Sequence, residues 1–339
     1  MSPSTTMSAP NVQAYPANYH QTLCPPTPSP GFNDPGELIR VWGKEWGASD
    51  DVGPLRMVLM RRPGDEMLRI RADCWNERAQ ALVDPDGKWY WTHRTPPDLP
   101  LMQAQHDGLA ETLRQEGAEV CYVQDVPPEF PKSVYTRDPM AAIRGGAIIG
   151  RLAPLMRRGE ERYVTQTVAA LGMPILKTIA GTGMMEGGTF AKVRKDLAIF
   201  GTSIRCNAEA AQQVEETLRW FGIELIVVPV SGWSIHLDGQ FVMVDTDKAL
   251  VNPLGLPHWF LDRLDELGIE SIYRHESERW ALNSLAVRPG RVIMNDSSPY
   301  TRERLEQRGI EVVAIPYDEV QKNGGGIHCS TMELLRDDT

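Results

Sequence analysis

The sequence predicts an α/β fold made of five similar units arranged as a solenoid or a propeller-like array. One observation is a repeated pattern in which a helix-like amphipathic stretch ends at a glycine and an apolar run follows. The pattern recurs about 40 to 55 residues apart, a period typical of repeat architectures. The second observation is that strand-like and helix-like stretches alternate along the chain, which favours an α/β fold over an all-β fold.

Each repeat is expected to contain two short strands, a helix and a third strand. The glycine follows the last turn of the helix, and the apolar run after it is the next strand. Leu197–Gly201 and Phe241–Asp245 are expected to be strands, and Ala208–Trp220 and His258–Leu267 are expected to be helices. The five helix-ending glycines are Gly117, Gly172, Gly222, Gly268 and Gly309.

The 339 residues would suffice for two domains, but large single domains of this length also occur. We predict one catalytic domain over residues 36–339. Residues 1–35 are rich in Pro, Ser and Thr and lack the apolar region of a signal peptide, so we expect a tail. Residues 66–100, with three tryptophans and several prolines, are additional to the first repeat. We predict a loop or lid there, with a structural flap as the alternative.

Charge and composition exclude several kinds of partner. The net charge of −10 and the lack of a Lys/Arg-rich run argue against nucleic acid. No apolar stretch approaches the length of a membrane span. The five cysteines are widely spaced and lack a C-x-x-C pair, so neither a zinc site nor a disulfide framework is expected. We expect a cytoplasmic protein with a small-molecule partner. The oligomeric state is open, with a homo-oligomer among the alternatives.

A reactive cysteine is predicted near the C-terminal end of the sequence. Cys329 follows the glycine triplet Gly324–Gly326, whose backbone can adopt positive φ and lets a ligand approach closely. A thiolate there would be a nucleophile if nearby charge lowers its pKa. Glu186 lies beside two glycines, and His236 and Asp238 would share one face of a strand. Together these residues supply a nucleophile, a proton shuttle and carboxylates for a cation.

The ordered set of motifs resembles the guanidino-group-modifying enzymes, which include arginine deiminase, dimethylarginine dimethylaminohydrolase, agmatine deiminase and the amidinotransferases. The resemblance covers the chain from about Val58 to Met332. The matching segments are Val58–Gly64, Tyr135–Asp138, Arg157–Glu160, Glu186–Gly188, Gly201–Arg205, His236–Asp238 and Gly324–Cys329. The resemblance implies an α/β-propeller (pentein) fold, in which five ββαβ units surround a pseudo-fivefold axis and the active site lies in the central channel.

The same resemblance implies a hydrolase that acts on C–N bonds of linear amidines. Cys329 would attack the central guanidino carbon and form a covalent thiouronium intermediate. His236 would transfer protons, and Glu186 would keep the imidazole oriented and cationic. Asp138 and Asp238 would pair with the guanidinium, in the geometry that Arg–carboxylate pairs favour. Neither a cofactor nor a metal is expected.

The implied substrate is arginine or a methylated arginine. In the deiminases an arginine at the position of Arg205 pairs with an α-carboxylate, and Arg158 is expected to assist it. Thr189 stands where the family usually has Asp, which leaves room for a neutral heterocycle such as a 2-nitroimidazole, with nitrite as leaving group. An amidinotransferase is the second alternative. A ligand-binding propeller without catalysis is disfavoured by the presence of Cys329 and His236.

Overall fold

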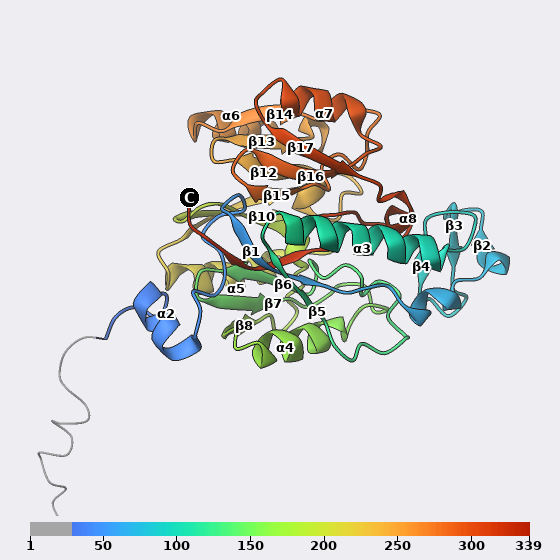
Figure 1. The fold of residues 1–339 in the computed structure, drawn as a ribbon, viewed down its shortest axis with the longest axis horizontal. Helices are drawn as coiled ribbons and strands as arrows, with labels where there is room; N and C mark the ends of the chain where they lie inside the picture. The colour runs from blue at the N-terminus through green and yellow to red at the C-terminus, as the bar shows by residue number, and fades with distance from the viewer. Residues whose placement is uncertain (1–28) are drawn as a thin grey trace, which may run out of the picture.

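The computed structural model describes residues 29–339, which form several short three-stranded sheets and the helices that pack on them (Figure 1). In five of the sheets, the middle strand pairs antiparallel with one neighbour and parallel with the other. The sheets, in strand order, are β18 (Met332–Arg336), β1 (Leu55–Met60) and β5 (Glu119–Tyr122); β6 (Met140–Ile143), β7 (Gly146–Ile149) and β8 (Ile175–Thr178); β9 (Phe190–Arg194), β10 (Leu197–Thr202) and β11 (Glu224–Pro229); β12 (Phe241–Asp245), β13 (Lys248–Val251) and β14 (Glu270–Tyr273); and β15 (Leu285–Arg288), β16 (Arg291–Asn295) and β17 (Glu311–Ile315).

One helix precedes the parallel strand of each sheet. Four units have the predicted ββαβ order along the chain, and in the unit of β1 the C-terminal strand β18 supplies the first strand. These helices are α3 (Leu99–Gln115), α4 (Glu160–Ala170), α5 (Ala208–Arg219), α6 (His258–Glu266) and α7 (Pro299–Glu306). The predicted strands and helices of the third and fourth units are confirmed as β10, β12, α5 and α6. Within residues 29–339 no backbone ladder joins one of these sheets to the next. The closed propeller with pseudo-fivefold symmetry therefore stays a prediction.

All five helices end by the same hydrogen-bonding arrangement. Each glycine predicted to follow a helix has a φ between 70° and 93°, the left-handed region that costs a residue with a Cβ energy. The next residue donates its N–H to a carbonyl five positions back, at 2.9–3.1 Å, as in a Schellman motif. The donor–acceptor pairs are Ala118–Leu113, Met173–Val168, Ile223–Leu218, Ile269–Leu264 and Ile310–Leu305. This local device turns each chain segment back along its sheet.

The apolar core lies between the helices and the first two strands of each unit. Strands β6 and β7 are buried along their whole length, and β10 is buried except at its last residue. The third strands, such as β5 and β8, are partly exposed. Strands buried on both faces appear in sequence as continuous apolar runs, which is why the segment of β10 was predicted as a strand. The buried ends of the first strands are where functional side chains gather.

The described part of the chain begins inside the predicted tail. Residues 1–28 lie outside the described residues, and helix α2 (Pro35–Trp42) begins at the predicted domain boundary. The side chain of Asp34 accepts a hydrogen bond from the Glu37 backbone and so caps this helix. None of the helices in residues 29–339 combines the length and apolar character needed to cross a bilayer.

The segment 66–100 has secondary structure of its own. It contains an antiparallel sheet of β2 (Trp75–Asn76), β3 (Ala81–Val83) and β4 (Tyr90–Trp91), with two short 3₁₀ helices before it. Figure 1 shows this sheet beside the short helix α8 (Asp318–Gln321). The Thr92 backbone N–H donates to the Lys322 carbonyl at 2.9 Å. The segment is therefore a folded flap attached to the chain that leads to Cys329, and its motion as a lid stays a prediction.

Candidate active site

Each of the five units contributes side chains to one site from the residues just before its first strand. The contributing residues are Asp138 before β6, Glu186 before β9, His236 and Asp238 before β12, Asn283 before β15, and Cys329 before β18. All six residues are buried, although three of them are carboxylates, which are mostly exposed in proteins. A cavity of about 350 Å³ is lined by His236, Asp238, Asn283 and Cys329, among others.

Cys329 is held by the side chain of Asn283. The amide nitrogen of Asn283 donates to the Cys329 Sγ at 3.0 Å, and its oxygen accepts from the Cys329 backbone N–H at 3.1 Å. Burial and the carboxylates of Asp238 and Asp138 raise the pKa of the Cys329 thiol well above its ordinary value, while the hydrogen bond from Asn283 acts the other way. In this arrangement the neutral thiol form of Cys329 is therefore favoured at neutral pH.

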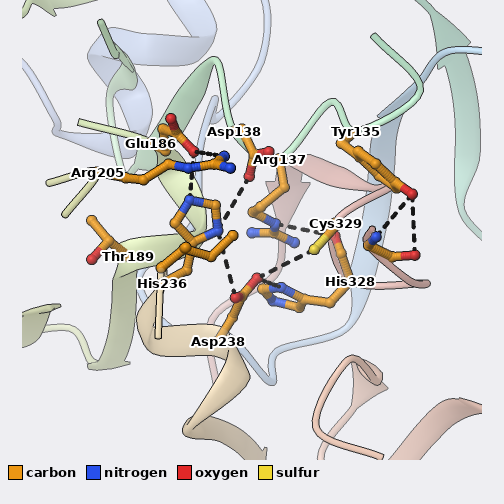
Figure 2. Close-up of polar contacts among 12 residues, drawn as sticks. Tyr135, Arg137, Asp138, Glu186, Thr189, Arg205, His236, Asp238, His328 and Cys329 are labelled. Carbon is orange, nitrogen blue, oxygen red and sulfur yellow. Dashed lines mark hydrogen bonds and ion pairs between the residues drawn. The ribbon is translucent and has the colours of Figure 1, made fainter. Parts of the chain in front are cut away.

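His236 lies between carboxylates, as Figure 2 shows. Its Nε2 is 2.6 Å from the Glu186 Oε2, and its Nδ1 faces Asp138 and Asp238 at 3.7 and 3.9 Å. Burial by itself would lower the pKa of His236, but the Asp138 carboxylate and the hydrogen bond to Glu186 outweigh it, so the pKa is raised. Burial would likewise raise the pKa of Glu186, yet the hydrogen bond from His236 lowers it to about 2. The pair is thus an imidazolium with a carboxylate.

The structure corrects the expectation that His236 and Asp238 lie on one strand. Leu237–Gly239 forms a 3₁₀ turn, and strand β12 starts only at Phe241. Both side chains still reach the site from this turn, and the backbone of Gly188 packs closely against them. A Cβ on Gly188 would come within 2.9 Å of the Asp238 Oδ2 and of the His236 Nδ1. This close approach is a physical reason for glycine in the Glu-Gly-Gly motif.

The two aspartates are fixed by different partners. Arg157 forms a buried ion pair with the Asp138 Oδ2, and Arg157 also binds Glu160 at 2.7 Å. The other oxygen of Asp138, Oδ1, has no hydrogen-bond partner among residues 29–339. His328 Nδ1 lies 2.9 Å from the Asp238 Oδ2, which is also 3.8 Å from the Cys329 Sγ. One carboxylate oxygen of each aspartate is therefore held by a neighbouring side chain.

Three residues predicted to bind substrate have other contacts. Arg205 donates to the Glu186 Oε2 at 3.1 Å and so joins the His236–Glu186 pair. Arg158 donates to the backbone carbonyls of Leu152 and Ala153 at 3.1 and 3.3 Å, and it is Arg157 that contacts Asp138. The Thr189 hydroxyl donates to the Gly201 carbonyl, and Thr189 is fully buried at the side of the cluster in Figure 2.

One group of side chains could hold a metal ion by geometry. Asp138, Glu186 and His236 each place one ligand-type atom within 4.8 Å of the others. However, Arg157 and Arg205 already pair with the two carboxylates. A cation would have to compete with two guanidinium groups, so the arrangement fits proton transfer better than metal binding.

Sequence reasoning missed Asn283, Arg157 and Tyr90. Asn283 could have been found as the polar residue that precedes the first strand of the fifth unit. Tyr90 belongs to the flap, and its hydroxyl lies 3.4 Å from the Arg205 Nη2. No sequence signal predicts the contact between Tyr90 and Arg205, because the two residues come from segments more than a hundred positions apart.

Comparison with known proteins gives a family and a set of similar folds. The family model of N,N dimethylarginine dimethylhydrolase, eukaryotic, matches residues 100–336. An arginine deiminase of Latilactobacillus sakei subsp. sakei (strain 23K) is 22% identical, covering 86% of this chain and 98% of the deiminase. A mutant dimethylarginine dimethylaminohydrolase from Pseudomonas aeruginosa, solved with citrulline, is 24% identical with a TM-score of 0.68, covering 83% of this chain and 99% of that chain. An amidinotransferase of saxitoxin biosynthesis from Microseira wollei is 15% identical with a TM-score of 0.67, covering 87% of this chain and 98% of that chain. The structural likenesses show a shared mixed α/β fold.

Proposed function

Because the chain belongs to the N,N dimethylarginine dimethylhydrolase family of guanidino-group-modifying enzymes, we propose that it is a cysteine-dependent hydrolase of arginine or a methylated arginine. One observation carries the proposal: a buried thiol, a carboxylate and an imidazole–carboxylate pair meet at a single cavity. Cys329 would be the nucleophile, His236 the proton carrier and Glu186 its orienting base.

The substrate would bind to the Oδ1 atoms of Asp138 and Asp238. The unpartnered Asp138 Oδ1 and the Asp238 Oδ1 both face the His236 Nδ1 region of the site. A buried carboxylate oxygen without a partner is costly, and a guanidinium N–H would satisfy it. The positive charge of the substrate would also lower the pKa of Cys329, because it offsets the carboxylates that raise that pKa.

The Cys329 thiolate would then add to the guanidino carbon to give a tetrahedral centre. His236 would donate its proton to the departing amine, which leaves an S-linked thiouronium on Cys329. A water molecule would lose a proton to the now neutral His236 and attack the thiouronium carbon. Collapse would release a ureido product and return the thiolate. The raised pKa of His236 supports this order, because it favours the protonated imidazole that must supply a proton to the departing amine.

The two enzyme alternatives differ in what supports them. The neutral heterocycle depended on Thr189 standing where the family usually has Asp, which removes a carboxylate beside the channel, and the Thr189 hydroxyl binds the Gly201 carbonyl. The unpartnered Asp138 Oδ1 and the buried Asp238 carboxylate favour a cationic substrate instead. Amidino transfer to an amine would use the same thiouronium intermediate as hydrolysis. The match to a family of hydrolases supports water as the acceptor.

We also propose that the five sheets form an α/β-propeller around this site. Support comes from contacts between first strands of neighbouring units, namely β18 with β6, β9 with β12, and β12 with β15. An experimental structure with one continuous sheet would contradict the propeller. Cys329 must stay reduced to react, which supports a reducing compartment such as the cytoplasm.

The test is product analysis with purified protein. The wild type should convert arginine or N-methylarginines into citrulline plus ammonia or an alkylamine, detected by mass spectrometry. Cys329→Ser should abolish turnover and keep the melting temperature, whereas Cys121→Ser, at a half-buried thiol away from the cavity, should keep activity. Nitrite from 2-nitroimidazole, or an amidino group moved to an added amine, would assign one of the alternatives. Full activity of Cys329→Ser would refute the mechanism.

A further inference from the structure

The cavity that contains Cys329 changes its chemical character from its inner end to its mouth. The inner wall is formed by buried residues, among them Cys329, His236 and Asp238. The wall at the mouth includes the half-buried Arg274 and the exposed Arg279. The carboxylate of Asp238 and the proposed nucleophile thus lie deep in the cavity, and the two guanidinium groups lie where the cavity opens to solvent.

The two arginines at the mouth have no carboxylate partner. Within residues 29–339, neither guanidinium forms an ion pair with an acidic side chain. Arg274 donates from Nη1 to the backbone carbonyls of His275 and Glu276, at 2.9 Å each. Burial lowers the pKa of Arg274 more than the charge of Glu276 raises it, so this guanidinium lacks a strong counter-charge. Arg279 lies 5.0 Å from the Trp280 ring centroid.

Arg205, the arginine expected to bind a substrate carboxylate, already contacts other side chains. Its Nη1 pairs with Glu186, and its Nη2 lies 3.4 Å from the Tyr90 hydroxyl. A substrate carboxylate placed there would compete with Glu186 for the same guanidinium. Arg274 and Arg279 form no ion pair with a carboxylate among residues 29–339. A guanidinium recognises a carboxylate through paired N–H donors.

The cavity has fewer side chains that could bind a substrate ammonium group than arginines that could bind a substrate carboxylate. Asp238 is the one carboxylate among the described residues that line it, and His328 already binds its Oδ2. At the mouth, the remaining large side chains are Trp233, which is 90% exposed, and Trp280. Tryptophan side chains beside a site are suited to cover the methylene chain of a ligand.

Building on the proposed function, we propose that Arg279, with Arg274, binds the carboxylate of the substrate while the guanidino group lies beside Cys329. The substrate class is then the ω-guanidino carboxylates, and the α-amino group of arginine is not required. Arg279 is thereby a specificity-determining residue that does not touch the reacting atoms.

The experiment compares three substrates that differ by one group. Arginine has both the carboxylate and the amine, agmatine lacks the carboxylate, and 5-guanidinopentanoate lacks the amine. Values of kcat/KM are measured for the wild type, Arg279→Gln and Arg162→Gln. Arg162 is the matched control, because it is also exposed and also lies near an aromatic ring, 5.6 Å from the Tyr163 centroid, but outside the cavity.

We expect the wild type to use 5-guanidinopentanoate at least as well as arginine, and both about tenfold better than agmatine, a ratio that corresponds to one ion pair. Arg279→Gln should lower kcat/KM about tenfold for the two carboxylates and leave agmatine unchanged, and Arg162→Gln should change nothing. An equal loss for agmatine, or no loss for the carboxylates, would overturn the role of Arg279. A strong preference for arginine over 5-guanidinopentanoate would overturn the substrate class.

Binding to Cys329→Ser, measured by calorimetry, separates this inference from the proposed function. If no guanidino compound is hydrolysed by the wild type, the proposed function fails. The carboxylate site is still tested, because 5-guanidinopentanoate should bind Cys329→Ser and should bind the Cys329→Ser/Arg279→Gln double variant about tenfold more weakly. Equal affinity for the two variants refutes the carboxylate site.

Discussion

Asn283 contacts Cys329 at two atoms, donating to its Sγ at 3.0 Å and accepting from its backbone N–H at 3.1 Å. The two residues lie 46 positions apart in the chain and at the starts of two different units. The amide therefore fixes both the backbone and the thiol of the proposed nucleophile. It also opposes the burial and the carboxylates that raise the thiol pKa.

Replacing Asn283 should weaken catalysis through the thiol. Asn283→Ala removes a hydrogen bond worth about 1 kcal/mol, so we expect the Cys329 pKa to rise further and kcat to fall roughly fivefold or more. The pH dependence of Cys329 alkylation measures the pKa directly. Asn252→Ala is the control, because Asn252 lines the same cavity but pairs with Gln240. An unchanged alkylation profile in Asn283→Ala would contradict the role.

The charge of a reagent should decide how fast Cys329 reacts. Burial and two aspartates raise the pKa of Cys329, so the thiolate fraction grows with pH and alkylation by neutral iodoacetamide should keep accelerating up to pH 9. A cationic haloacetamidine should react faster at pH 7, because its charge offsets the carboxylates. Both rates are measured by mass spectrometry at Cys329, with the Cys329→Ser protein as blank. Equal rates at pH 7 would mean that the aspartates do not act on the thiol.

His236 and Glu186 should behave as one catalytic unit. Their side chains are 2.6 Å apart, and each favours the charged form of the other. Glu186→Gln and His236→Asn should each lower kcat by orders of magnitude, and the double variant should lose little more. Simply additive losses would assign Glu186 a separate role, such as holding the substrate.

Arg205→Ala distinguishes two roles for this arginine. If Arg205 acts through Glu186, as their 3.1 Å contact suggests, kcat should fall for arginine and agmatine alike. If Arg205 binds the substrate carboxylate, KM should rise for arginine and stay constant for agmatine. Steady-state kinetics with the two substrates gives the answer. We expect the first pattern, with a loss of about tenfold or more, since a buried charged hydrogen bond is removed.

His106 should make the fold sensitive to acid. This residue lies on the buried face of α3, neither ring nitrogen has a partner among residues 29–339, and burial lowers the pKa of His106 to about 3. Between pH 6.5 and 3 the unfolded chain binds a proton that the folded chain does not, so this contribution to stability is full above pH 6.5 and is lost as the pH falls. Its loss amounts to ~1.4 kcal/mol per pH unit at most.

His106→Leu should therefore flatten the dependence of unfolding free energy on pH across this range. Urea denaturation at several pH values measures it. His93→Leu is the control, because His93 lies exposed in the flap. Parallel curves for wild type and His106→Leu would show that His106 binds protons to the same extent in the folded and unfolded chain, and so would contradict the prediction.

Local sequence determined the repeated unit of this protein. The glycines that follow the five helices adopt left-handed φ in every case, and strand β12 has the predicted bounds. Such features depend on backbone conformations and on apolar periodicity within a dozen residues, so one segment of sequence contains the whole cause. The family was indicated by a resemblance in the ordered set of motifs, whose residues also stand in the sequence itself.

Tertiary structure alone decided which of those residues meet and what each contacts. Arg157 rather than its neighbour Arg158 binds Asp138, and Asn283 completes the surroundings of Cys329. Adjacent arginines look equivalent in sequence, and their roles diverge only because the turn before α4 directs one inward and the other to backbone carbonyls. Contacts between residues far apart depend on how the sheets pack, which no local pattern encodes.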